Sequence, residues 1–488
     1  MNETIVVEKY KYYFPLIILP VYFVVSVIGV YHHELWLDEA HSFLLARDNN
    51  SLPAMIQACR YEGHPLLWNI LLFIVTRFTH NVLGMQLLHV VINCFTVYFI
   101  CKSPFSIVEK ILIIFSYYCL FEYNIISRNY GMGLLFIVMV AYVYSKNNKA
   151  LLTLSVLLFL LANTHLFALL FSVAFAIMYL VFNRAVLAGT KRKLLILSGC
   201  ILLAGWVIAA LAIMPPSGYT STFIGHETSG YLSPARLLKT ISVCLKGIFY
   251  LPDYFKYHFM NTVLYNRIPG YIVLVLSLLA FAVPIVLLNK YKQAVCLFIL
   301  FSFLYVAVYY FMPLTYGIRY FGFFYMAFIA CYWLAYKNVS NTKKKVVAVI
   351  LFVQFVNGLY ACTMDIRYPF SESKNVGRFL NEHIQKENVY IIGNTPRPGI
   401  SAYTGKKYFG TENGQMLSYC LWNKQLPDDS LKHLLNIHLN QDTTPSIIIA
   451  NQPLGAFLDT SKLVKINAFD KGIESGDNVT IYRYLPGK

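Results

Sequence analysis

Long apolar stretches separated by short polar connectors make up most of the chain up to about residue 362. A membrane-spanning helix needs about 20 mostly apolar residues. About twelve stretches approach or meet this length, and they lie near 13–31, 65–80, 84–101, 111–126, 129–145, 150–164, 166–183, 194–214, 270–288, 293–312, 320–336 and 346–362. The pattern predicts a polytopic α-helical membrane protein.

The stretch 65–80 differs from the others because it is short, carries Arg77 and follows directly on Gly63-His64-Pro65. These features favour an interfacial or re-entrant helix, which leaves about 11 transmembrane helices. Lys-rich connectors mark the inner face of a membrane protein. With the N-terminus inside, all such connectors share one face, and they are 102–110, 146–149, 184–193, 290–292 and 337–345. The outer face then receives the loops 32–83 and 215–268 and everything after residue 362.

The composition changes after residue 362, where charged residues, Gly and Pro become frequent. Helix-like and strand-like stretches alternate there, which is typical of an α/β domain. They are 371–386, 389–393, 429–440, 446–450 and 479–484. We therefore expect a transmembrane domain over 1–362 and a small C-terminal α/β domain over 363–488 on the outer, extracytoplasmic side.

The amino-acid composition supports the prediction of a membrane protein. Of the 488 residues, 58% are hydrophobic and 13% are charged, against roughly a quarter charged in soluble domains. These values exclude a soluble enzyme, a disordered chain and a disulfide-rich secreted module. The apolar stretch 13–31 has no small-residue cleavage site after it and is expected to be a retained span, not a removed signal.

The net charge is +17, but the basic residues form short clusters between apolar stretches. This placement indicates membrane topology and anionic lipid headgroups, and we expect no nucleic-acid partner. The 10 cysteines show no CxxC or Cys/His spacing. We therefore expect no metal site, no cofactor and no disulfide framework.

Ionisable groups near membrane depth are costly and are candidates for function. Asp38 and Glu39 follow the first span beside Trp36, and a carboxylate in a partly dry pocket suits a general base. The alternative is a solvated loop whose acids cap the next helix. His64 lies in Gly63-His64-Pro65, a motif that is equally typical of a simple turn.

Two arginines and a second histidine fall on the same predicted face. Arg128 lies in Ser-Arg-Asn-Tyr at a span end, His165 follows Thr164, and Arg319 stands at a late helix start. The fork of an arginine suits phosphate oxygens. Snorkelling arginines and a structural histidine are the alternatives. Together with the two carboxylates, these residues predict a site for a substrate linked to a lipid phosphate.

Taken in order, these motifs resemble the GT-C superfamily of glycosyltransferases that use polyprenyl-phosphate sugars, including protein O-mannosyltransferases and lipid A aminoarabinose transferases. The matching motifs are Asp38-Glu39-Ala40, Gly63-His64-Pro65, Ser127-Arg128-Asn129-Tyr130, Thr164-His165 and Ile318-Arg319-Tyr320. The resemblance covers about residues 13–336 and implies a GT-C-like fold. The family's common His-Pro-Pro appears here as His64-Pro65-Leu66, and Leu166 replaces an aromatic residue, so the branch and the substrate stay open.

The resemblance implies an inverting transfer of a sugar to an extracytoplasmic acceptor, which is a glycan, a lipid or a protein. Asp38 would be the general base. Glu39 would orient the acceptor or steady the local network. Arg128 and Arg319 would bind the donor phosphate and stabilise it as it leaves.

Further donor contacts are expected from His64, His165, Tyr130 and Tyr316, and no metal is expected. Loop 215–268 would close over the donor or pack at the interface. A transporter or flippase, or a polymerase, of lipid-linked oligosaccharide is the alternative class. A transporter favours internal repeats and charges in mid-membrane, neither of which the sequence shows. The class suggests a bacterial inner (plasma) membrane, or the endoplasmic reticulum of a eukaryote.

Overall fold

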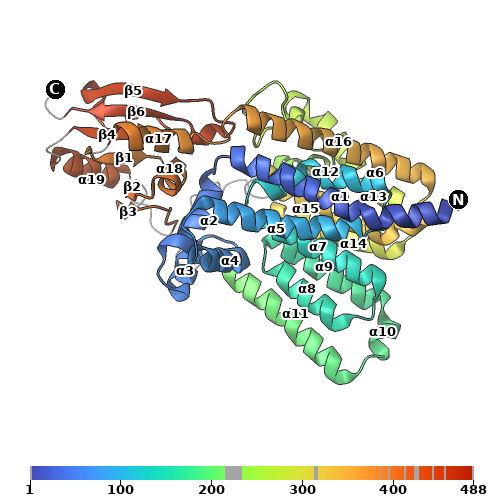
Figure 1. Ribbon diagram of the computed structural model, residues 1–488. Helices are drawn as coiled ribbons and strands as arrows, with labels where there is room; N and C mark the ends of the chain where they lie inside the picture. Colours follow the sequence, from blue (N-terminus) through green and yellow to red (C-terminus); the bar gives the residue numbers. More distant parts are fainter. Residues whose placement is uncertain are drawn as a thin grey trace.

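A computed structural model describes most of the chain as a helical bundle joined to a C-terminal sheet domain (Figure 1). The described residues are 3–214, 233–312, 317–384, 386–393, 396–410, 414–422, 428–441, 445–455 and 458–485. The two parts follow each other along the chain, and the long helix α16 (Asn341–Arg367) leads directly into the sheet domain.

Seven of the described helices are long and apolar enough to cross a membrane. They are α1 (Glu3–His32), α5 (Val82–Cys101), α11 (Arg192–Ile213), α13 (Gly270–Leu288), α14 (Lys292–Phe311), α15 (Ile318–Ala335) and α16 (Asn341–Arg367). Four shorter apolar helices accompany them, namely α4 (Leu67–Thr76), α7 (Tyr130–Lys146), α8 (Leu151–Ala162) and α9 (Leu166–Phe182). Helix α4 has 10 residues, about half of what a bilayer requires.

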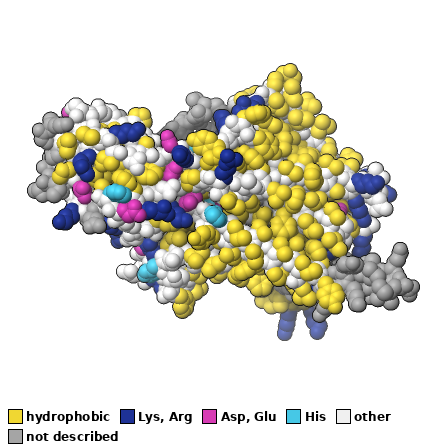
Figure 2. Space-filling model, turned by 45° about the horizontal axis from the view of Figure 1, so that its top comes forward, with side chains coloured by type: hydrophobic (Ala, Val, Ile, Leu, Met, Phe, Trp, Pro, Cys, Tyr) yellow, Lys and Arg dark blue, Asp and Glu magenta, His cyan; other side chains and the backbone are white. Residues whose placement is uncertain are grey.

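The outer surface of the bundle is apolar, as a lipid-facing surface must be. Large side chains such as Leu211 on α11 and Phe303 on α14 are 64% and 69% exposed. Figure 2 shows hydrophobic side chains over most of the helical part, with charged side chains gathered near the sheet domain and at the far end of the bundle. The predicted helical character is confirmed, and the apolar helices of membrane-spanning length support the prediction of a membrane protein.

The stretch 111–126, predicted as one span, is broken in two. Helix α6 (Ile107–Ile114) ends, and a π-helix, η2 (Tyr117–Ile125), begins after Ser116. The Ser116 hydroxyl accepts from the Cys119 amide, 3.4 Å away, and donates to the carbonyl of Ile113. Helix α16 passes so close that a Cβ on Gly358 would lie 2.5 Å from the Phe115 carbonyl oxygen. The stretch is therefore not one continuous helix, and α16 packs directly against the backbone at the break.

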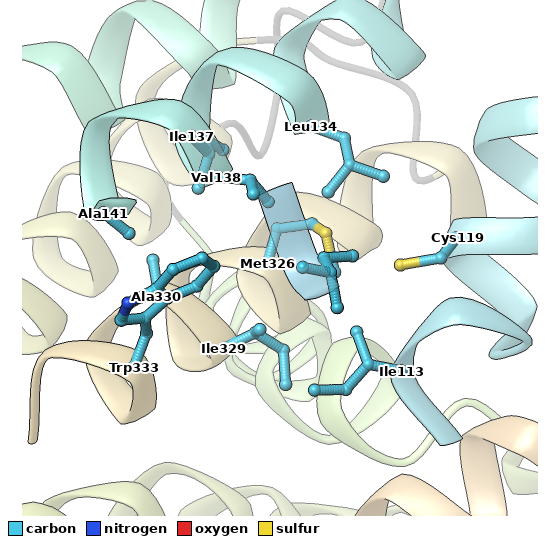
Figure 3. Close-up of a pocket in the computed structure, with 11 residues that line it drawn as sticks. Ile113, Cys119, Leu134, Ile137, Val138, Ala141, Met326, Ile329, Ala330 and Trp333 are labelled. Carbon is cyan, nitrogen blue, oxygen red and sulfur yellow. The ribbon is translucent and has the colours of Figure 1, made fainter. Parts of the chain in front are cut away.

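The interior of the bundle is densely packed. Between α7 and α15 lies one small cavity of about 10 Å³, lined by apolar side chains that include Leu134, Met326 and Trp333 (Figure 3). A space of this size is near the minimum that holds one water molecule, and a water needs polar partners that these side chains lack. The cavity is therefore a packing gap and not a binding site.

The C-terminal domain is a six-stranded mixed sheet with helices, in the strand order β3-β2-β1-β4-β6-β5. Its elements are α17 (Ser373–His383), β1 (Val389–Ile392), α18 (Pro396–Thr404), β2 (Tyr408–Gly410), β3 (Met416–Leu417), α19 (Asp428–Gln441), β4 (Ser446–Ala450), β5 (Leu463–Phe469) and β6 (Val479–Tyr484). Strand β1 pairs in parallel with β2 and β4, and the other pairs are antiparallel. The predicted α/β character is confirmed, while α18, β2, β3 and β5 were not anticipated.

The sheet domain packs on the first loop after α1 and on helix α2 (Leu37–Asp48). The Tyr403 hydroxyl accepts from the Leu35 amide at 2.8 Å, and the Cys420 amide donates to His41 Nδ1 at 3.3 Å. His258, on the segment after α12 (Pro234–Ile248), lies 2.6 Å from the carbonyl oxygen of Gly472. The domain thus covers the end of the bundle where the predicted site residues lie.

Candidate functional site

Asp38 stands in the first turn of α2 between two arginines that come from distant parts of the chain. Its Oδ2 lies 2.7 Å from Arg319 Nη1 and 3.6 Å from Arg128 Nη1. Arg128 Nη1 also donates to the backbone carbonyl of Asp38 at 2.5 Å. The structure therefore brings together three of the predicted site residues.

The backbone at both arginines is held by buried side chains. His89 on α5 lies 2.9 Å from the carbonyl oxygen of Asn124 and 2.7 Å from that of Arg128. The Tyr123 hydroxyl donates to the carbonyl of Arg319 at 2.5 Å. Since η2 supplies Asn124 and Tyr123, the π-helix ties the two arginine segments to each other.

Some buried nitrogen atoms of the two guanidinium groups donate no hydrogen bond to the described residues. Within the described part of the chain, Arg319 Nε and Nη1 and Arg128 Nε have no hydrogen-bond partner. The close Asp38–Arg319 contact is thus an ion pair without a directed hydrogen bond. Buried donors without acceptors are costly, and here they fit a phosphate that would supply several acceptor oxygens.

The charge state of Asp38 follows from two opposed effects. Burial favours the neutral acid, but the guanidinium groups of Arg319 and Arg128 outweigh it and hold the pKa of Asp38 below its ordinary value. Asp38 is therefore a carboxylate at neutral pH. While both arginines remain bound to it, it is a weak base.

The two predicted histidines meet beside this pair, with ring centroids 5.3 Å apart. Burial, with Arg128 adding to it, lowers the pKa of His64 to about 3. Burial and the neighbouring His64 also hold the pKa of His165 well below its usual value. Both rings are neutral, so they would contact a ligand by hydrogen bonds and stacking and not as cations.

His165 also has a structural task. It is the N-cap of α9, where its Nδ1 accepts from the Phe167 amide at 3.2 Å, and its ring stacks on Phe323. Tyr130, another predicted donor contact, is buried with its ring centroid 4.9 Å from that of His165. Within the described residues its hydroxyl has no hydrogen-bond partner.

Glu39 is fully buried and faces a different set of partners from Asp38. Its Oε1 accepts from the Ser127 amide at 2.6 Å, and its Oε2 lies 2.9 Å from His33 Nε2. His33 Nδ1 in turn lies 3.0 Å from Asp365 Oδ2, at the end of α16. Of the two roles expected for Glu39, this geometry favours steadying the local network over contact with an acceptor.

His33 is one residue that the sequence did not single out. Burial opposes its charge, but the carboxylates of Asp365 and Glu39 outweigh burial and hold its pKa well above the usual value. A charged imidazole between two buried carboxylates joins α1, α2 and α16 next to the site. Only its position just after the first apolar stretch, 13–31, brought it near the predicted site.

The sheet domain adds two acids that sequence reasoning also missed, Glu474 and Asp477. Their loop docks by backbone bonds, with the amides of Ile473 and Glu474 donating to Pro369 and Phe370. Burial raises the pKa of Glu474, and burial holds that of Asp477 well above its usual value, with the negative Asp38 contributing to both. The short Glu-Ser-Gly-Asp stretch gave no signal because it reads as an ordinary turn.

Tyr316 and residues 215–232 of the predicted closing loop lie outside the described residues. Among the residues that the structure does describe, no group of three or more His, Cys, Asp or Glu side chains could hold a metal ion. The 10 cysteines all lie in the described part of the chain, and none of them forms a disulfide bond there.

No protein-family model and no curated protein matches this chain. The resemblance to GT-C glycosyltransferases therefore rests on the motifs and remains a hypothesis about the site at Asp38.

Proposed function

We propose that this membrane protein is a glycosyltransferase that moves a sugar from a polyprenyl-phosphate donor to an extracytoplasmic acceptor. One observation carries the proposal: the carboxylate of Asp38 lies between the guanidinium groups of Arg319 and Arg128, and within the described residues the buried Nε of each arginine has no hydrogen-bond partner. A base beside two phosphate-binding groups is what an inverting transfer from a sugar phosphate needs.

In the proposed step, Asp38 accepts the proton of an acceptor hydroxyl while that oxygen forms a bond to the anomeric carbon. The bond between the anomeric carbon and the phosphate oxygen breaks, and its electron pair stays on the polyprenyl phosphate. Arg319 and Arg128 stabilise the charge that develops on this leaving group. The acceptor attacks from the face opposite the phosphate, so the anomeric configuration inverts.

The resting ion pair gives Asp38 a second property. A donor phosphate competes with Asp38 for the two arginines, because all three groups occupy one small buried region. Once Arg319 and Arg128 turn to the phosphate, they stabilise the carboxylate of Asp38 less, and its pKa rises. Donor binding thereby makes Asp38 a stronger base when it is needed.

The remaining parts of the proposal concern topology and partners. Helices α7, α8 and α9 and the α6–η2 pair would bring the seven long helices to eleven spans in a GT-C-like fold. The sheet domain would lie on the extracytoplasmic side of a bacterial inner membrane, where it covers the Asp38 site. The acceptor would be a lipid-linked or surface glycan, lipid A or a protein.

A panel of polyprenyl-phosphate sugars tests the proposal on the full-length protein in nanodiscs. We expect one donor to raise the melting temperature, since a ligand at 100 times its dissociation constant adds about 2.7 kcal/mol of stability. At the same donor concentration, this stabilisation should fall to about 0.4–1.4 kcal/mol in Arg319→Ala. The matched control is Arg184→Ala, an exposed arginine on α10 (Arg184–Ala188), which should respond like the wild type.

Turnover separates an enzyme from the alternatives. A donor that stabilises the protein should also be consumed, with transfer of its sugar to an added acceptor. Binding without transfer to any acceptor, together with movement of the donor across the bilayer, would instead identify a flippase. The absence of stabilisation by every donor would contradict the proposed site.

A further inference from the structure

A large cavity lies at the end of the bundle away from Asp38. It has a volume of about 920 Å³ and is formed by residues from four connections between helices. Its lining residues are Cys101–Phe105, Lys110, Tyr144–Lys146, Asn148, Tyr291, Gln293, Trp333, Leu334, Tyr336, Lys337 and Lys344. A volume in this range suits a small-molecule ligand or a lipid headgroup.

The charged residues that line this cavity are all positive. It includes five lysines, Lys102, Lys110, Lys146, Lys337 and Lys344, and no Asp or Glu. Positive residues at a membrane boundary are common because they set topology. Topology alone, however, does not require lysines from separate connectors to face one shared cavity.

The same cavity has aromatic walls beside the lysines. Lys344 Nζ lies 3.9 Å from the ring centroid of Tyr336, which fixes the lysine against an aromatic face. Lys110 is buried, and its Nζ donates to the carbonyl of Cys101 at 2.8 Å. The nearby Glu109 accepts hydrogen bonds from hydroxyl groups, including that of Tyr336 at 2.9 Å. Cationic and aromatic surfaces side by side suit an amphiphilic anion.

The position of the cavity across the membrane indicates the source of such a ligand. Helix α15 and the short 3-10 helix η4 (Tyr336–Asn338) that continues it run from Arg319 at the Asp38 site to Lys337 at the cavity. This distance corresponds to about 27 Å at 1.5 Å per residue. This length is close to the thickness of the hydrocarbon core of a bilayer, about 30 Å. Figure 2 shows Lys and Arg side chains at this far end of the bundle. The cavity thus lies at the depth of lipid headgroups.

We propose that this lysine cavity, defined by the lining residues above, binds the phosphate headgroup of an anionic membrane lipid. The lysines bind the phosphate, and the aromatic side chains contact the glycerol and the first part of the acyl chains. The proposal does not depend on the reaction at Asp38.

Native mass spectrometry of the full-length protein tests the proposal, with phosphatidylglycerol and phosphatidylcholine as probes. We expect the wild type to retain phosphatidylglycerol preferentially. The variant Lys102→Gln/Lys344→Gln should lose this preference by about 30-fold, the effect of removing two lysines near a lipid phosphate. A second variant, Lys146→Gln/Lys337→Gln, changes two exposed lysines of the cavity. It repeats the test in case the first variant does not fold.

The matched control is Lys191→Gln/Lys193→Gln, which removes the same charge at the same end of the bundle but outside the cavity. It should keep the preference for phosphatidylglycerol. An equal loss in the control would overturn the proposal in favour of general attraction to a basic surface. If millimolar inorganic phosphate displaces phosphatidylglycerol, the cavity is a site for a free anion and the lipid assignment is overturned.

Discussion

Asp38 Oδ2 and Arg319 Nη1 lie 2.7 Å apart, although α2 and α15 stand near opposite ends of the membrane part of the chain. The proposed base is thus bound to the group that would hold the leaving phosphate. A resting site with its own internal anion avoids leaving two buried arginines without a counter-charge, which would be costly. The pair also links donor binding to the strength of the base, and each partner can be tested separately.

Replacing Asp38 by Asn should remove the base and keep the shape of the side chain. We expect the rate of sugar transfer to fall by about 10²- to 10⁴-fold, the usual contribution of a general base. Donor affinity should be retained or improved, because Arg319 and Arg128 lose their internal competitor. Single-turnover transfer and donor binding measure the two effects. The control is Glu387→Gln, which breaks an ion pair with Arg483 in the sheet domain. Turnover at the wild-type rate in Asp38→Asn would exclude the base role.

Replacing Arg319 by Lys keeps the charge but removes the planar fork, and Ala removes both. A hydrogen bond to a charged group contributes about 1.5–3 kcal/mol, so donor affinity should fall by about 10- to 100-fold in Arg319→Ala and less in Arg319→Lys. Removing the cation also raises the pKa of Asp38, so the acidic limb of the profile of kcat/KM against pH should move to higher pH. If the acidic limb does not move in Arg319→Ala, the titration of Asp38 does not cause this limb.

His33→Ala should destabilise the fold, because Glu39 and Asp365 would remain buried without their shared partner. Breaking a buried pair in this way costs about 3–5 kcal/mol. The loss should appear as a lower melting temperature in detergent, with a smaller loss in His33→Gln, whose amide NH2 group can still donate hydrogen bonds. A melting temperature unchanged in His33→Ala would show that the network is not needed for stability.

The contact between His41 and Glu62 should make stability depend on alkaline pH. Burial opposes the charge of His41, but Glu62 at 2.8 Å outweighs it and raises the pKa of His41 from 6.5 to about 10. A raised pKa in the folded state stabilises the protein fully below pH 6.5, and this contribution is lost as the pH rises through about 10. Between these pH values, the melting temperature of His41→Gln should fall less steeply with rising pH than that of the wild type. The variant of the exposed His80, His80→Gln, should follow the wild type.

Gly131→Ala should disturb the site without changing any charged group. A Cβ at this position would lie 2.5 Å from His89 Nε2 and 2.7 Å from the Tyr123 carbonyl oxygen, so the segment that carries Arg128 must shift. We expect weaker donor binding and a lower melting temperature. Gly199→Ala on α11 has no atom within 4 Å of the new Cβ and should stabilise its helix by up to about 1 kcal/mol. Equal behaviour of the two variants would contradict the packing argument.

Most of the local structure was predictable from the sequence. Apolar stretches of nearly 20 residues form helices because the bilayer accepts few other backbone structures, and strands β1, β4 and β6 follow from short β-branched runs such as Ser446–Ala450. Helix α18 escaped prediction because it begins with Pro396-Arg397-Pro398-Gly399, residues typical of a loop. The break before η2 lies against Gly358 of α16, a contact between distant segments that no local pattern reveals.

The sequence by itself determined a membrane protein of apolar helices, a polar C-terminal α/β domain, and the residue types from which the candidate site is drawn. Only the tertiary structure decided which of those residues meet. It paired Asp38 with Arg319 and Arg128, turned the adjacent Glu39 toward His33, and placed Glu474 of the sheet domain near the same site. Hydrophobic periodicity is a local property, since it reports which face of a segment avoids water. Contacts between distant segments depend on how helices cross, and a single sequence does not encode those crossings in any local pattern.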